Sequence, residues 1–228
     1  MTMIADNLHD VRARIAAACQ IAGRRAEDVA LLAVSKTFGA QAVRAAFDAG
    51  QRAFGENYIQ EGITKIAALA ELRADLIWHC IGPIQSNKTR LVAERFDWAH
   101  TIDRLKIAER LSAQRPAGLP PLKVCIQVNI DGGPTKSGVS PADALALARA
   151  VAALPRLALR GIMTIPEPAL DFEAARAVHA RAKALLEQLN AAGLKLDTLS
   201  AGMSADLEAA VAAGSTMVRV GTAIFGGR

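Results

Sequence analysis

The feature of this sequence that most restricts its fold is a regular alternation of short apolar runs with longer helical patterns. Residues 29–34 form a continuous apolar run, which is too short for a helix and typical of a strand buried on both faces. Helical character follows over residues 41–49 and ends at Gly50. The same order then repeats along the chain. Strands are expected over residues 29–34, 52–55, 76–81, 98–102, 122–129, 157–163, 196–200 and 217–220.

This alternation predicts the fold class. Strands separated by helices pair in parallel, because each connection has to cross back over the sheet. Eight such units in about 200 residues favour a closed (β/α)8 TIM barrel, with an open doubly wound sheet as the alternative. We expect a single domain over residues 1–228 and no second domain. The last strand leaves no room for a full eighth helix, so an additional amphipathic helix at the N-terminus is expected to fill that gap.

Composition and charge exclude several classes of function. The net charge is +5, but the basic residues are scattered and form no arginine-rich arm, so no nucleic-acid partner is expected. Signal-peptide and membrane-spanning patterns are absent, which predicts a cytoplasmic protein that does not enter a membrane. Cys19, Cys80 and Cys125 are far apart and odd in number, as free thiols in a reducing compartment are. The four histidines show no metal-ligand spacing with them, so no metal is expected.

One lysine occupies a position where a barrel places its chemistry. Lys36 follows directly on the first expected strand, and the loops at the carboxyl ends of barrel strands carry function. An amine that is shielded from water there becomes a usable nucleophile and can form an imine with an aldehyde. A lysine that only extends its ammonium into solvent is the alternative interpretation.

Two segments near the end of the chain favour an anion. Residues 200–204 run from a strand into a helix, with two serines and a glycine among them. Residues 219–222 follow the last strand, and Gly221 permits close approach of the backbone. Barrels commonly bind phosphate with the loops after strands seven and eight. A phosphorylated aldehyde would satisfy both the lysine and these segments. Pyridoxal 5′-phosphate (PLP) is the leading ligand, and a phosphosugar in a class I aldolase is the competitor.

The same regions carry a resemblance to a known family. The chain resembles the pyridoxal 5′-phosphate homeostasis proteins, which are related to the barrel domain of fold-type III alanine racemases. The resemblance covers nearly the whole chain in the expected order. It is carried by the motifs at residues 33–37 (AVSKT), 54–58 (FGENY), 78–88 (WHCIGPIQSNK), 102–108 (IDRLKIA), 136–138 (KSG) and 215–226 (STMVRVGTAIFG). Residues 130–135 depart from the usual form of the loop ahead of Lys136.

The resemblance implies a role for each matching position. Lys36 corresponds to the lysine that holds PLP as a Schiff base, and Asn57 and His79 correspond to positions near the cofactor ring. Arg219 corresponds to the arginine that faces the pyridine nitrogen. The phosphate-binding segments correspond to Ser200, Met203, Gly221 and Thr222.

These assignments predict a PLP-binding protein that takes part in vitamin B6 homeostasis, with no catalytic residue. An arginine beside the ring nitrogen keeps that nitrogen unprotonated, so the ring is a weak electron sink. A racemase needs proton donors on both faces of the α-carbon, and the single tyrosine, Tyr58, is expected at the start of a helix. A fold-type III enzyme with weak racemase activity is the alternative. The expected partners are PLP and PLP-dependent apoenzymes that receive it, and the expected state is a monomer.

Overall fold

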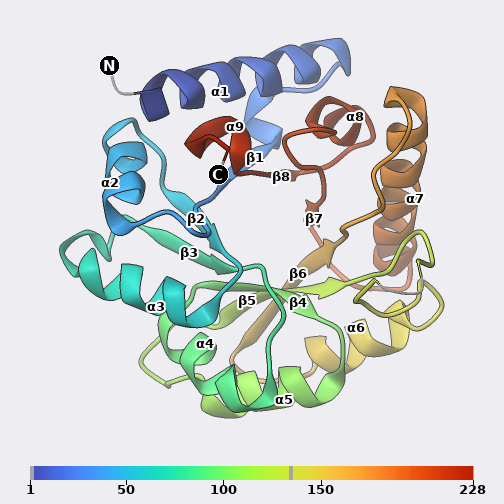
Figure 1. The fold of residues 1–228 in the computed structure, drawn as a ribbon. Helices are drawn as coiled ribbons and strands as arrows, with labels where there is room; N and C mark the ends of the chain where they lie inside the picture. The colour runs from blue at the N-terminus through green and yellow to red at the C-terminus, as the bar shows by residue number, and fades with distance from the viewer. Residues whose placement is uncertain (1–2, 134–135, 228) are drawn as a thin grey trace.

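The strands form a closed barrel in the computed structural model, which describes residues 3–133 and 136–227 (Figure 1). Pro134 and Thr135, in the loop ahead of Lys136, lie outside the described residues. The strands are β1 Ala30–Val34, β2 Ala53–Glu56, β3 Ile77–Cys80, β4 Trp98–Ile102, β5 Leu122–Gln127, β6 Leu157–Met163, β7 Thr198–Ser200 and β8 Met217–Val220. Each pairs in parallel with its neighbours, and β1 closes on β8 from Ala30 opposite Met217 to Ala33 opposite Val220. The TIM-barrel prediction is confirmed, and the doubly wound sheet is excluded.

Helices surround the barrel in chain order (Figure 1). They are α1 Met3–Ile21, α2 Ala40–Asp48, α3 Ile59–Ala68, α4 Thr89–Arg95, α5 Leu105–Gln114, α6 Ala144–Ala152, α7 Phe172–Ala191, α8 Leu207–Ala212 and α9 Thr222–Phe225. Within the described part of the chain, none of them combines the length and apolar character that a bilayer crossing requires.

The N-terminal helix α1 fills the place of the eighth barrel helix, as predicted. It packs against α8, α9 and α2, and Figure 1 shows it lying across the last turns of the chain. The amide of Asn7 donates to Ile224 O over 2.8 Å. Arg14 binds Glu208 over 2.7 Å and also donates to Ser204 O over 3.0 Å. The start of the chain is therefore attached to segments on either side of β8.

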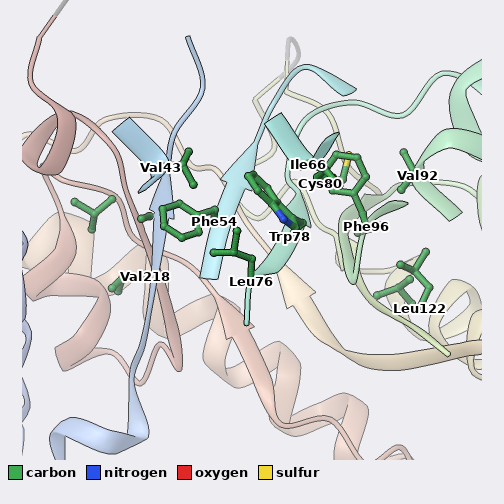
Figure 2. Close-up of a cluster of buried hydrophobic side chains, with 14 of the residues drawn as sticks. Val43, Phe54, Ile66, Leu76, Trp78, Cys80, Val92, Phe96, Leu122 and Val218 are labelled. Atoms are coloured by element: carbon green, nitrogen blue, oxygen red, sulfur yellow. The ribbon is translucent and has the colours of Figure 1, made fainter. Parts of the chain in front are cut away.

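The apolar core lies mainly between the strands and the helices. Alternate strand residues point outward, so Phe54 and Trp78 of adjacent strands are fully buried there with ring centroids 5.9 Å apart. Figure 2 shows these rings among aliphatic side chains such as Val43, Ile66 and Val92. Burial of such side chains contributes about 1.5–3 kcal/mol each to stability. This layer accounts for the near-continuous apolar character of the strands.

A short turn precedes α6, which begins at Ala144 with Asp143 as its N-cap residue. Ser140 belongs to this turn, where its hydroxyl accepts from the Asp143 N–H over 3.2 Å. A serine followed by proline produces this local turn as readily as a helix cap, because both use the same short side-chain hydrogen bond.

Candidate functional site

A cavity of about 470 Å³ lies at the carboxyl ends of the strands. This volume falls within the range of sites that hold small molecules and cofactors. Residues from both ends of the sequence line it, because β1 and β8 are neighbours in the closed barrel. The predicted site residues that line the cavity are Lys36, Asn57, Met203, Arg219, Gly221 and Thr222.

Lys36 lies in a tight turn at the end of β1. The N–H of Phe38 donates to Ser35 O over 3.1 Å, which makes Lys36 and Thr37 the two central residues of the turn. Thr37 has a φ of 69°, a value that favours glycine or asparagine at the second central position. Lys36 itself is half-buried. Phe38 stacks on Phe225 with centroids 5.2 Å apart, so the turn also contacts the end of the chain.

Another part of the cavity wall consists of the two segments predicted to bind phosphate. Ser204, Ala205 and Thr222 line the cavity, and their backbone N–H groups donate to no other described residue. Gly221 lies close to β1: a Cβ there would stand 3.1 Å from Val34 O. The wall therefore offers several N–H donors within one cavity, which is the arrangement that a phosphate group requires.

Asp206 stabilises this wall from behind. Its carboxylate accepts from the Met203 N–H over 2.6 Å and from His179 Nε2 over 2.8 Å. Burial raises the pKa of Asp206, but the hydrogen bonds from His179 and Met203 outweigh burial and lower the pKa overall. The Met203 N–H is thus already used, so an anion in the cavity has to bind the neighbouring donors.

Arg219 lies at the floor of the cavity and is almost completely buried. Its Nη1 donates to Ser200 O and Oγ over 2.6 and 2.9 Å, and its Nη2 donates to Thr164 O over 2.8 Å. Burial lowers the pKa of Arg219 to about 10, so the guanidinium remains protonated at neutral pH. Its Nε–H has no acceptor among the described residues, which leaves a donor for a ligand.

A chain of buried polar side chains continues from Arg219 into the barrel. Ser200 Oγ lies 3.0 Å from His100 Nδ1, and His100 Nε2 lies 2.9 Å from His79 Nδ1. The ring of His79 stacks on Trp98 with centroids 5.1 Å apart. We call Arg219, Ser200, His100 and His79 the histidine chain.

Both histidines of this chain are neutral. Burial, with a smaller contribution from Lys123, lowers the pKa of His79 to about 3. Burial, His79 and Arg219 together hold the pKa of His100 well below its usual value. Arginine only donates, so the arrangement that uses every donor runs from Arg219 to Ser200, from the Ser200 hydroxyl to His100, and from His100 Nε2–H to His79. The other three members of the histidine chain therefore hold Arg219 in place without adding charge.

The structure separates the predicted residues into two groups. Six line the cavity, whereas His79 and Ser200 lie behind Arg219 within the histidine chain. His100 was not among the site residues predicted from the sequence, although the structure places it between Ser200 and His79 in the histidine chain. The period-two spacing of Trp98 and His100 on β4 was the available signal, because it directs both side chains to the same face of the strand.

Comparison with known proteins identifies the family. The family model for the N-terminal domain of alanine racemase matches residues 7–228. The pyridoxal phosphate homeostasis protein of Pseudomonas aeruginosa is 60% identical over the whole chain and 97% of that protein. The protein of the same name from Escherichia coli K12 is 57% identical over the whole chain and 98% of that protein. This chain belongs to the pyridoxal phosphate homeostasis protein family.

Solved structures agree with this placement in the family. PipY from Synechococcus elongatus, solved without PLP, is 40% identical and has a TM-score of 0.87, with 98% of this chain and 100% of that chain covered. The same protein solved with PLP bound is 38% identical with a TM-score of 0.85, at the same coverage. An alanine racemase from Clostridium difficile, 18% identical with a TM-score of 0.73, shares the fold; 98% of this chain and 57% of that chain are covered.

Proposed function

We propose that this chain binds PLP in the cavity at the carboxyl ends of the strands and holds it as a reversible Schiff base on Lys36. The observation that carries the proposal is the cavity itself, which joins Lys36 to the N–H donors of residues 204–205 and 222 across one opening. PLP supplies an aldehyde that condenses with a primary amine to form a C=N bond and release one water, and hydrolysis reverses the step. The PLP-bound structure of PipY supports this choice of ligand.

Each wall of the cavity has a separate task in this proposal. Lys36 provides the amine, and the unused N–H groups of Ser204, Ala205 and Thr222 receive the phosphate. Arg219 presents a protonated donor to the ring nitrogen, which keeps that nitrogen unprotonated. His79 and Ser200 act through Arg219, and Asn57 completes the wall next to Lys36.

We further propose that the protein sequesters and delivers PLP without catalytic turnover. Among the described residues that line the cavity, Lys36 and Arg219 are the ionisable side chains. A racemase needs a second acid or base on the other face of the substrate. Tyr58 is more than half exposed at the N-cap of α3 and does not line the cavity. The proposal includes a cytoplasmic monomer that supplies PLP-dependent apoenzymes, and the three free, buried cysteines are consistent with a reducing compartment.

The test is borohydride reduction of the PLP-loaded protein, followed by mapping of the modified lysine. We expect the label on Lys36 and a visible absorption band that Lys36→Ala abolishes. Lys88→Ala, which changes a half-buried lysine beyond β3, is the matched control and should retain the band. Labelling of another lysine in place of Lys36 would refute the assignment. A second experiment is incubation with L-amino acids in deuterated water, in which addition of the protein should cause no exchange of the α-proton. Sustained exchange would restore the racemase alternative.

A further inference from the structure

Lys65 is a buried lysine outside the cavity, and its ammonium group makes three hydrogen bonds. Its Nζ donates to Ser35 O over 2.6 Å, to Glu56 Oε1 over 2.7 Å and to Glu61 Oε1 over 2.6 Å. Three donors are the full complement of an ammonium group. Lys65 is 3% exposed and Glu56 is fully buried, so these bonds form largely away from water.

The three acceptors connect Lys65 to both ends of the turn that carries Lys36. Ser35 O is the carbonyl that closes the turn with the Phe38 N–H, and the Ser35 hydroxyl donates to Glu56 Oε1 over 2.6 Å. Glu61 Oε1, which accepts from Lys65, also accepts from the Thr37 N–H over 2.6 Å. The residues immediately before and after Lys36 are therefore both attached to one ammonium group. We call Lys65, Glu56 and Glu61 the lysine clamp.

The turn needs such support because its backbone is strained. Thr37 has a φ of 69°, a conformation that costs an L-residue about 1–2 kcal/mol. Strained residues persist where surrounding contacts determine their conformation. The clamp supplies these contacts from α3, which packs close to β2: a Cβ at Gly62 would stand 3.2 Å from Glu56 Cβ.

We propose that Lys65 is a positioning residue, which fixes the turn at residues 35–38 so that the amine of Lys36 faces into the cavity. The proposal rests on the proposed Schiff-base role of Lys36. A lysine on a mobile turn would spend part of its time directed away from the cavity, which reduces its effective concentration at a bound aldehyde. Phosphate binding at residues 204–205 and 222 does not involve the clamp.

The clamp should therefore affect ligands with and without an aldehyde differently. We expect Lys65→Met to weaken PLP binding about tenfold and to slow its reaction with Lys36, since several hydrogen bonds to the turn are lost. Binding of pyridoxine 5′-phosphate, which has no aldehyde, should change less than twofold. Lys195→Met, at an exposed lysine before β7, is the control and should bind both ligands as the unsubstituted protein does.

A second pair of variants tests the same idea without removing a buried charge. Glu61 is partly exposed, so Glu61→Ala should remain folded and weaken PLP binding about fivefold. Glu61→Gln keeps an oxygen that accepts from the Thr37 N–H, and it should restore most of the affinity. Equal losses for Ala and Gln, or parallel losses for PLP and pyridoxine 5′-phosphate, would overturn the positioning role. Failure of borohydride to label Lys36 in the unsubstituted protein would instead refute the proposed function.

Discussion

The two polar networks beside the cavity, the lysine clamp and the histidine chain, use opposite ways of keeping polar groups buried. The clamp combines a cation with two carboxylates and reaches solvent through Glu61, whose side chain is 27% exposed. The histidine chain is enclosed, and both of its imidazoles are neutral. A buried charge is costly without partners, so the two imidazoles stay neutral beside the one cation of the histidine chain, Arg219, whereas the clamp pairs its cation with carboxylates. The difference shows that ion pairs support the cavity on one side, whereas on the other side hydrogen bonds join the Arg219 cation to neutral groups.

The largest effect should follow from removal of the one charged member of the histidine chain. Arg219→Met leaves the buried Thr164 O without its donor, and it removes one of the two donors to Ser200 O, which keeps the Thr164 N–H. We expect the free energy of unfolding of the PLP-free protein to fall by about 3 kcal/mol, measured by urea denaturation. Arg176→Met, at a half-exposed arginine on α7, should change it by less than about 0.5 kcal/mol. If Arg219→Met lowered the free energy of unfolding no more than Arg176→Met does, the stability of the histidine chain would not depend on Arg219.

The pH dependence of stability should follow the neutral histidines. The pKa of His79 in the folded protein is about 3, below the 6.5 of an unfolded chain, so between these values the unfolded state binds more protons. Stability should therefore fall as the pH drops below 6.5, by up to about 1.4 kcal/mol per pH unit for each histidine. His100→Gln keeps a neutral side chain that hydrogen-bonds, and it should roughly halve this slope in urea denaturation at pH 6.5, 5.5 and 4.5.

The lysine clamp should respond with the opposite sign. Burial raises the pKa of Glu56 against the effect of its bonds with Lys65 and Ser35, so the folded state holds this proton more tightly than the unfolded chain does. Its contribution to stability is present below pH 4.5 and is lost as the pH rises through the raised pKa. Glu56→Gln removes this loss. The free energy of unfolding should then rise more steeply with pH, because the histidine effect is no longer opposed. If Glu56→Gln and His100→Gln changed the pH dependence of the free energy of unfolding in the same direction, the two networks would not respond to pH with opposite signs.

The sequence predicted the barrel and the cavity more completely than the networks behind it. Strand order, the position of α1 and the convergence of Lys36 with residues 203–205 and 219–222 all follow from patterns along the chain. The clamp was not predicted, although Lys65 shares a helix face with Gly62, Ile66 and Leu69, where a lysine is unexpected. Its acceptors come from the residue after β1, from β2 and from α3, and no local pattern specifies that these three groups meet. Networks of this kind depend on tertiary packing and become visible only in the folded structure.

The smallest effect concerns the strain that distinguishes the two networks. Thr37, at the clamp, has a positive φ, whereas no member of the histidine chain does. Glycine adopts this conformation without strain but loses more backbone entropy on folding, so Thr37→Gly should raise the free energy of unfolding by only about 0.5 kcal/mol. In a Lys65→Met background the turn can relax, so the strain is no longer imposed and the gain should disappear. A double-mutant cycle of the two substitutions measures this coupling in the PLP-free protein. An equal gain in both backgrounds would mean that the turn keeps its conformation without the clamp, and that Lys65 does not hold Lys36 in place.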